Sequence, residues 1–168
     1  MRVYLSENAF LDLLLSSAEV YKRECLGFLL GYRLEDRFIV EHAFSFQTAS
    51  RRPKGVISND RSHQKIDPII ARFDRLQIVG DFHSHTQFGE QRGLAFPSSE
   101  DIASMTQDKI YLIVAINSRR KEKVWTENAD KTISGSVGDF FFKIAACFVN
   151  KHSSVRRAKI HCPFPPGF

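Results

Sequence analysis

The segment from Lys109 to Asn117 constrains the fold most, because its centre is the uninterrupted apolar run Tyr-Leu-Ile-Val-Ala-Ile. A short apolar run without polar alternation is typical of a strand that is buried on both faces. Such a strand lies at the centre of a sheet and needs a packed layer on each side. We therefore expect a sheet whose middle is covered on both faces.

The rest of the chain supplies further strands and helices around this one. Further strands are expected over 25–32, 38–46, 78–85 and 123–126, the last of them pairing with 109–117 across a turn at 117–121. Helices are expected over about 7–20 (capped by Ser6), 59–76, 98–105 and 137–149, with Pro68 delaying or kinking the second. Polar segments over 47–58 and 86–97 are expected to be loops. Helices and strands mix without strict alternation, which predicts an α/β fold with a mixed sheet covered by helices.

Chain length and composition favour one domain. The chain has 168 residues, of which 43% are hydrophobic, enough for one core. The end of the chain differs from the rest, because it is basic and finishes in Cys-Pro-Phe-Pro-Pro-Gly-Phe. We expect a domain over residues 1–150 and a basic, proline-rich tail without regular structure over 151–168.

Several features of the chain favour the cytoplasm. No run approaches the roughly 18–20 apolar residues of a membrane span. Glu7 and Asp12 interrupt the apolar pattern that a secretory signal would have. The three cysteines are spread singly along the chain, which argues against a disulfide framework and against a thiolate zinc knuckle.

The positive charge of the chain is local. The formal net charge is +5, and the excess lies in three clusters, at residues 51–54, 119–123 and 151–159. Basic clusters bind nucleic acid in some proteins, but aromatic side chains then alternate with them. Apart from Trp125 near Lys123, such aromatics are sparse here. We therefore interpret the clusters as solvated surface and keep nucleic-acid binding as an alternative.

His83 and His85 form the first part of a candidate metal site. They stand two residues apart at the end of an expected strand. Side chains at positions i and i+2 of a strand point to the same side, so both imidazoles can reach one point. Two imidazoles and a carboxylate make an open zinc site. Alone, such a pair is a weak signal, because two hydrogen-bonded surface histidines give the same pattern.

Ser98 and Asp101 form the second part, at the start of an expected helix. The spacing S-x-x-D also matches a capping box, in which both side chains satisfy free N–H groups of the first helical turn. By itself this pattern favours the cap. Both roles coexist if the Asp101 carboxylate also turns toward a metal.

Glu24 precedes an apolar strand that carries Gly27 and Gly31. An acidic residue at the mouth of a strand is commonly a solvated end residue. The glycines leave room for close packing or for the close approach of another chain. Cys25 beside Glu24 is a conceivable nucleophile, but a small apolar residue in a strand is more often part of the core.

Together, in this order, the three segments resemble the JAMM metalloproteases, also called the catalytic MPN or Mov34 family. That family has a glutamate before a G-x-L-x-G-like strand, then H-x-H, then S-x-x-D. The resemblance covers roughly residues 5–150, and its motifs are specific because three separated segments must agree. The matching positions are Glu24, Gly27, Leu29, Gly31, His83, His85, Ser98 and Asp101.

The resemblance implies a fold, a metal and a reaction. The fold would be an MPN domain, similar to the cytidine-deaminase-like arrangement, with a strongly curved mixed sheet between helices. His83, His85 and Asp101 would bind Zn²⁺, Glu24 would move a proton from water to the leaving amine, and Ser98 would donate a hydrogen bond. The substrate would be an amide or isopeptide bond at the C-terminus of a ubiquitin-like or sulfur-carrier protein. The oligomeric state is left open.

The chain departs from the family in two places. Thr86 stands where the family usually has proline directly after H-x-H. The loop from Thr86 to Pro97 is also longer than usual. We expect this loop to be mobile and to shape access to the metal.

Two rival interpretations involve the same motifs. Asp81 to Thr86 also matches the D-x-H-x-H-T start of polymerase-and-histidinol-phosphatase-type phosphoesterases, but too little chain follows for their barrel. A non-catalytic MPN scaffold is the second rival. Such relatives lack the zinc ligands, and this chain keeps all of them.

Overall fold

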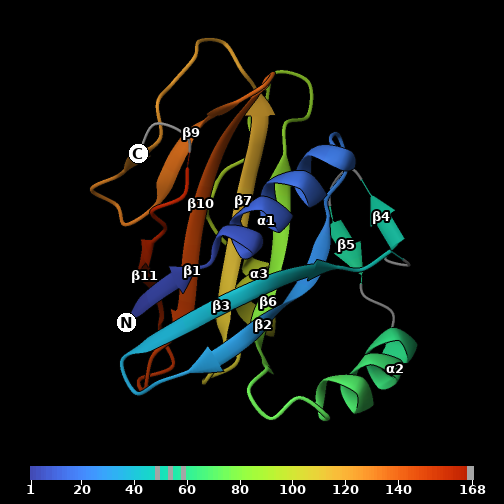
Figure 1. The fold of residues 1–168 in the computed structure, drawn as a ribbon. Coiled ribbons are helices and arrows are strands. Elements are labelled where there is room, and N and C mark those ends of the chain that lie inside the picture. The colour runs from blue at the N-terminus through green and yellow to red at the C-terminus, as the bar shows by residue number, and fades with distance from the viewer. Residues whose placement is uncertain (48–49, 53–54, 58–59, 166–168) are drawn as a thin grey trace.

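A computed structural model of the chain describes residues 1–47, 50–52, 55–57 and 60–165 (Figure 1). Three helices and eleven strands follow one another within these residues. The first half holds β1 (Arg2–Leu5), α1 (Glu7–Glu19), β2 (Leu26–Arg33), β3 (Arg37–Ser45), β4 (Ser50–Arg52), β5 (Gly55–Ile57), α2 (Asp60–Ile70) and β6 (Gln77–Thr86). The second half holds α3 (Ser99–Ser104), β7 (Ile110–Ser118), β8 (Thr126–Glu127), β9 (Ile133–Val137), β10 (Phe140–Val149) and β11 (Val155–His161).

The main sheet closes on itself. Its nine strands have the order β11-β1-β3-β2-β6-β7-β10-β9-β8, and β10 also pairs with β11. Seven strands, from β11 to β10, therefore form a closed ring of pairings. Strand β1 is parallel to β11 and β3, and β6 is parallel to β7, whereas the other pairs of the ring are antiparallel. The expected mixed α/β sheet is confirmed, but the sheet dominates and closes instead of lying curved between helices.

Strand β7 is the central strand that the sequence predicted. Every residue from Ile110 to Asn117 is buried. Leu112, Val114 and Ile116 pack in the main core together with residues of α1, which lies against one face of the sheet (Figure 1). Tyr111 and Ile113 belong to a separate cluster on the opposite face. Both faces of β7 are covered, which explains its apolar run.

The predicted helix over 137–149 is wrong, because Phe140–Val149 forms strand β10. This strand pairs with β7 along one edge and with β9 and β11 along the other. Residues 144–147 in its interior are buried in succession, so the strand lacks the polar alternation that would separate it from a buried helix. The predicted pairing of 123–126 with 109–117 is also wrong. Strand β10 occupies that edge of β7, and Thr126–Glu127 pairs with β9 instead.

The predicted lack of regular structure after residue 150 is wrong for Val155–His161. These residues form β11, which closes the ring between β1 and β10. Ala158 and Ile160 of this strand are buried in the main core. Strands β1 and β11 are short, and both contain basic residues among their apolar ones. Their place in the sheet depends on the pairing of β1 with β11, which lie far apart in the sequence. Where the domain ends stays a prediction.

The remaining elements follow the predictions more closely. Helix α1 begins after Ser6, whose Oγ accepts the N–H of Ala9 at 3.0 Å. Helix α2 is shorter than expected and contains Pro68. The expected loop over 47–58 holds the short pair β4–β5, and residues 48–49, 53–54 and 58–59 lie outside the described chain. Within the described residues, no helix is long and apolar enough to cross a membrane.

Candidate metal centre

Strand β6 presents both histidines on one face. Its parallel register with β7 places His83 beside Ile113 and His85 beside Ala115, on the face opposite the α1 core. Phe82, the residue before His83, points into that core. The alternation of the strand therefore directs both imidazoles to the outer face, as the spacing predicted.

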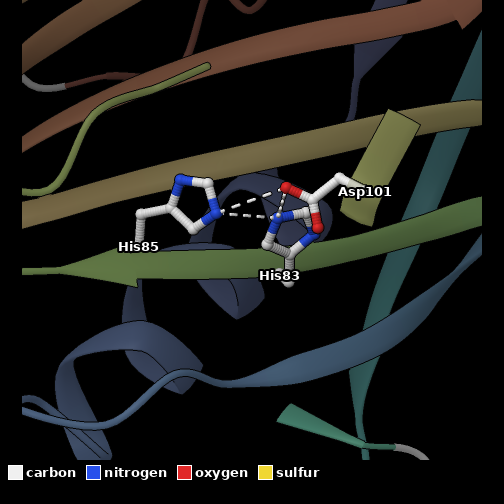
Figure 2. A group of neighbouring side chains, drawn as sticks. All are labelled: His83, His85 and Asp101. Carbon is white, nitrogen blue, oxygen red and sulfur yellow. Dashed lines mark hydrogen bonds and ion pairs between the residues drawn. The ribbon is translucent and has the colours of Figure 1, made fainter. Parts of the chain in front are cut away.

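Asp101 of helix α3 completes the cluster. Its Oδ2 lies 3.3 Å from Nε2 of His83 and 3.6 Å from Nε2 of His85. The two Nε2 atoms lie 3.1 Å apart. Figure 2 shows the carboxylate and both rings converging on one point from β6 and α3. The structure thus brings together the three residues that the sequence singled out as metal ligands.

These three atoms have a spacing that suits a tetrahedral metal ion. Around zinc, with bonds of about 2.0–2.1 Å, neighbouring ligand atoms lie about 3.3–3.4 Å apart. The observed separations of 3.1, 3.3 and 3.6 Å bracket this range. Within the described chain, His83, His85 and Asp101 are a group that could hold a metal ion.

Helix α3 also begins with the capping box that was the competing interpretation. Ser98 Oγ accepts the N–H of Asp101 at 3.1 Å, and the N–H of Ser98 donates to Asp101 Oδ2 at 2.6 Å. The oxygen that accepts this bond is the one that faces the histidines. The same oxygen atom therefore caps the helix and is the candidate metal ligand. The capping box and the metal site are compatible interpretations of S-x-x-D.

A backbone carbonyl fixes the His85 ring. Its Nδ1 lies 2.8 Å from the carbonyl oxygen of Leu94. Because a carbonyl only accepts hydrogen bonds, Nδ1 carries the proton and Nε2 of the neutral ring presents its lone pair to the cluster. Orientation of this kind is usual for histidines that bind metals. This contact could not be predicted from the sequence, because the acceptor is a main-chain atom.

Asp101 and His85 shift each other's pKa in opposite directions. Burial opposes ionisation of Asp101, but hydrogen bonds from His83 and His85 hold the pKa of this carboxyl far below its usual range. Burial also lowers the pKa of His85, but the contacts with Asp101 and Leu94 and the charge of Glu24 outweigh it, so the pKa is raised. The carboxylate is therefore ionised and stabilises the protonated form of the His85 ring.

Glu24 lies two residues before strand β2, near enough to the cluster for its charge to act on His85. Leu26 pairs with His83, and Cys25 exchanges two hydrogen bonds with Ser84: its N–H donates to Ser84 Oγ at 2.9 Å and its carbonyl accepts the Ser84 N–H at 3.0 Å. Continued one residue further back, this register sets Glu24 opposite His85. Directly opposed residues point their side chains to the same face. This position explains why the charge of Glu24 acts on the pKa of His85.

Two residues for which sequence reasoning predicted no role in the site hold this arrangement. Ser84 faces away from the metal cluster and binds the backbone of Cys25. Thr86, where the family usually has proline, accepts the N–H of Lys22 through Oγ1 at 3.2 Å. Lys22 has a positive φ of 82° in the turn that leads to Glu24. The alternation of β6, which turns Ser84 and Thr86 away from the histidines, was a signal that could have identified them.

The long loop after β6 is held against the sheet, and the prediction that it is mobile has no support in these contacts. The N–H of Gly93 donates to Asn117 Oδ1 at 2.8 Å, and Arg157 Nη2 donates to the Ala95 carbonyl at 3.1 Å. A Cβ atom on Gly93 would lie 2.2 Å from the His85 carbonyl oxygen. Only glycine therefore allows the loop to lie this close to His85.

Sequence and structure comparisons agree with this geometry. The family model of prokaryotic homologs of the JAB domain matches residues 6–128, which include Glu24 and the three candidate ligands. The chain belongs to this family. The resemblance to the JAMM/MPN family is thereby confirmed. No curated protein matches the chain.

Two solved structures share the fold of this JAB-domain protein. A Desulfitobacterium hafniense protein, known from a solution structure, superposes with a TM-score of 0.66 at 18% identity and covers 95% of this chain and 92% of its own. A Salinibacter ruber protein superposes with a TM-score of 0.53 at 19% identity, with 99% and 94% coverage. At these identities the likeness concerns the fold alone.

Proposed function

We propose that this JAB-domain protein is a zinc-dependent hydrolase that cleaves an amide bond. The observation that supports it most is the triangle of His83 Nε2, His85 Nε2 and Asp101 Oδ2, with sides of 3.1–3.6 Å, beside the segment that carries Glu24. Two imidazoles and one carboxylate are a donor set of catalytic zinc sites, in which one coordination position stays open.

Each residue around the site has a role in this proposal. A zinc ion held by these ligands supplies Lewis acidity toward water and toward a carbonyl group. Glu24 accepts a proton from the attacking water at its carboxylate and delivers it to the leaving amine nitrogen. Ser98 Oγ accepts the N–H of Asp101 and can still donate its own proton, which we assign to the developing oxyanion.

We further propose a protein substrate. Large apolar side chains are exposed on both segments that flank the cluster: Phe88, Leu94 and Phe96 in the loop after β6, and Ile102 in α3. Exposed apolar groups gathered beside a reactive centre favour contact with a protein. By family resemblance, the substrate is the C-terminal region of a ubiquitin-like or sulfur-carrier protein in the cytoplasm, attached by a peptide or isopeptide bond.

Zinc content tests the ligand set. Purified protein is expected to contain about one zinc ion per chain, measured by elemental analysis, because three protein ligands define one open site. His85→Ala is expected to lose this zinc, whereas His152→Ala, which changes an exposed histidine far along the chain, keeps it. Full zinc content in the His85→Ala protein, with its fold retained, would contradict the site.

The role of Glu24 is tested separately from metal binding. Glu24→Gln is expected to keep zinc and to lose hydrolysis, by a factor on the order of 10²–10⁴ for a general acid–base residue. Glu19→Gln, at the exposed end of α1, is the matched control and stays active. A Glu24→Gln protein with undiminished turnover would sink the mechanism. If wild-type protein with zinc hydrolyses none of the ubiquitin-like conjugates offered, the alternative of a non-catalytic MPN scaffold is favoured.

A further inference from the structure

A pocket of about 370 Å³ lies beside the metal cluster, between the long loop and the outer face of β7 and β10. Two small side chains, Ala95 and Ala115, line it and pack together with Ala145. Phe96 and Phe141 are among its walls. The pocket exists because the loop crosses the sheet over alanines, which leave space above the strands.

The pocket shares a wall with the metal centre. Leu94 lines the pocket, and its carbonyl accepts the hydrogen bond from His85 Nδ1 at 2.8 Å. Ala115, which also lines the pocket, is the register partner of His85 in the parallel pair β6–β7. A group bound in the pocket would therefore lie next to the substrate atoms at the cluster.

Three cationic side chains line this pocket: Arg92, Lys143 and Arg157. Lys143 Nζ and Arg157 Nη1 both contact Oδ2 of Asp130, at 3.0 and 2.8 Å. Arg92 lies over the Phe141 ring, 5.7 Å from its centre, and within the described residues no carboxylate forms an ion pair with it. One carboxylate thus pairs with two of the three cations, which leaves the pocket with an excess of positive charge.

We propose that this pocket binds a carboxylate of the substrate next to the bond that is cleaved. Guanidinium and ammonium groups form charge-assisted hydrogen bonds with carboxylates, and the aromatic walls pack against an aliphatic stem. The carboxylate is either an acidic side chain or the free C-terminus of a chain. The pocket thereby selects among substrates, and its position beside a scissile bond rests on the proposed function, whereas its affinity for carboxylates does not.

Binding without turnover tests this selectivity. The probes are fluorescein-labelled octapeptide pools with amidated C-termini, in which one position is Glu, Gln or Lys and the others are mixtures of uncharged residues. Full-length Glu24→Gln protein loaded with zinc is expected to bind the Glu pools roughly five- to tenfold more tightly than the Gln pools in fluorescence anisotropy, and the Lys pools least tightly. Equal affinity for the three pools would overturn an acidic side chain as the source.

A second pair of probes separates the two sources of carboxylate. Gln pools with a free C-terminal carboxylate are compared with the same pools carrying an amide. Tighter binding of the free carboxylate assigns the pocket to a chain end, and tighter binding of internal Glu assigns it to a side chain. The absence of both preferences overturns the proposal.

Arg92→Glu tests whether the preference arises in this pocket. It is expected to remove the preference for Glu and to improve binding of the Lys pools, because the substitution reverses the charge at the wall. Arg120→Glu makes the same change at an exposed position outside the pocket and is expected to keep the preference. Equal effects of the two variants would show a general effect of net charge and overturn the assignment.

Hydrolysis assays keep the two proposals distinguishable. If wild-type protein cleaves conjugates without regard to charge and the Glu24→Gln protein binds all pools alike, carboxylate binding in the pocket is contradicted and the proposed hydrolase activity is supported. If the pools bind with the predicted preference and no amide bond is cleaved, the proposed hydrolase activity is contradicted and carboxylate binding in the pocket is supported. Thermal melting of each variant shows that the fold is retained.

Discussion

Asp101 carries out two tasks with one carboxylate oxygen. Oδ2 accepts the N–H of Ser98 at the start of α3 and also faces both histidines. The cap holds the carboxylate in place, so the candidate ligand does not have to be ordered when a metal binds. At this position a local rule of helix formation and the geometry of a metal site require the same residue.

The two tasks can be separated by substitution. Asp101→Asn is expected to lose zinc while its amide oxygen still accepts the Ser98 N–H, so α3 keeps much of its cap. Ser98→Ala is expected to keep all three ligands while lowering the free energy of unfolding by about 1 kcal/mol, the usual cost of losing an N-cap. Elemental analysis and urea unfolding measure the two effects. Equal zinc loss in both variants would show that the cap, rather than the ligand atom, governs binding.

Thr86 is expected to act on turnover through the position of Glu24. Thr86→Val keeps the shape of the side chain but loses the acceptor for the Lys22 N–H. We expect a lower kcat with little change in KM and with zinc retained, because the segment that carries Glu24 is no longer tied to β6. Thr86→Ser, which keeps the hydroxyl, is expected to restore kcat. If both variants behave like wild type, Thr86 has no positioning role.

At the scale of the elements, local sequence patterns predicted the helices and strands whose formation depends on nearby residues. Helix α1 has a cap and a helical apolar pattern, and β7 has an apolar run, so both were found. Strand β10 was mistaken for a helix, since its interior is buried without the polar alternation that marks a strand. The three candidate ligands were predictable because they come from separated motifs of fixed spacing. The Leu94 carbonyl and the pocket were not, because both depend on how the loop folds over β7.

Strand β11 is expected to be essential to the stability of the domain. Ile160 is buried in the main core and pairs with Val3 of β1. Ile160→Ala is expected to lower the free energy of unfolding by about 2–5 kcal/mol, as for other large-to-small changes in a core. Arg156→Ala, on the same strand but exposed, is the control and should change it by less than about 0.5 kcal/mol. Chemical unfolding curves that coincide for the two variants would mean that β11 contributes little.

At the scale of the whole molecule, Asp130 links parts of the chain that lie far apart. It follows β8, and its carboxylate contacts Lys143 on β10 and Arg157 on β11. Arg157 in turn donates to the Ala95 carbonyl in the loop beside the metal cluster. The contacts of Asp130 and Arg157 therefore join the strands where the sheet closes and also hold the loop beside the metal cluster.

These contacts predict a pH-dependent contribution to stability. Partial burial opposes ionisation of Asp130, but hydrogen bonds from Thr132 and Lys143 hold the pKa of the carboxyl well below its ordinary value of 3.8. A carboxyl whose pKa is lowered by folding stabilises the folded state above the unfolded pKa, and this stabilisation is lost as the pH falls toward the folded pKa.

Asp130→Asn is thus expected to be less stable than wild type at pH 7, by up to about 1 kcal/mol because the ion pairs are partly exposed. The difference in free energy of unfolding between the two proteins should narrow as the pH falls below 3.8. Urea unfolding at several pH values measures it, with Asp139→Asn at an exposed position as the control. A deficit in the Asp130→Asn protein that is the same at pH 3 and pH 7 would contradict the electrostatic origin.

The double use of Asp101 also bears on how such a domain diverges. Glu24 comes from a different segment than the three candidate ligands, so a descendant could lose it and still bind metal. Replacement of Asp101 by any residue without a side-chain acceptor at this position would weaken the start of α3 as well as the metal site. Descendants that give up catalysis are therefore expected to lose the glutamate early and the aspartate late. Inactive relatives that retain the metal cluster would be a natural intermediate between an enzyme and a scaffold.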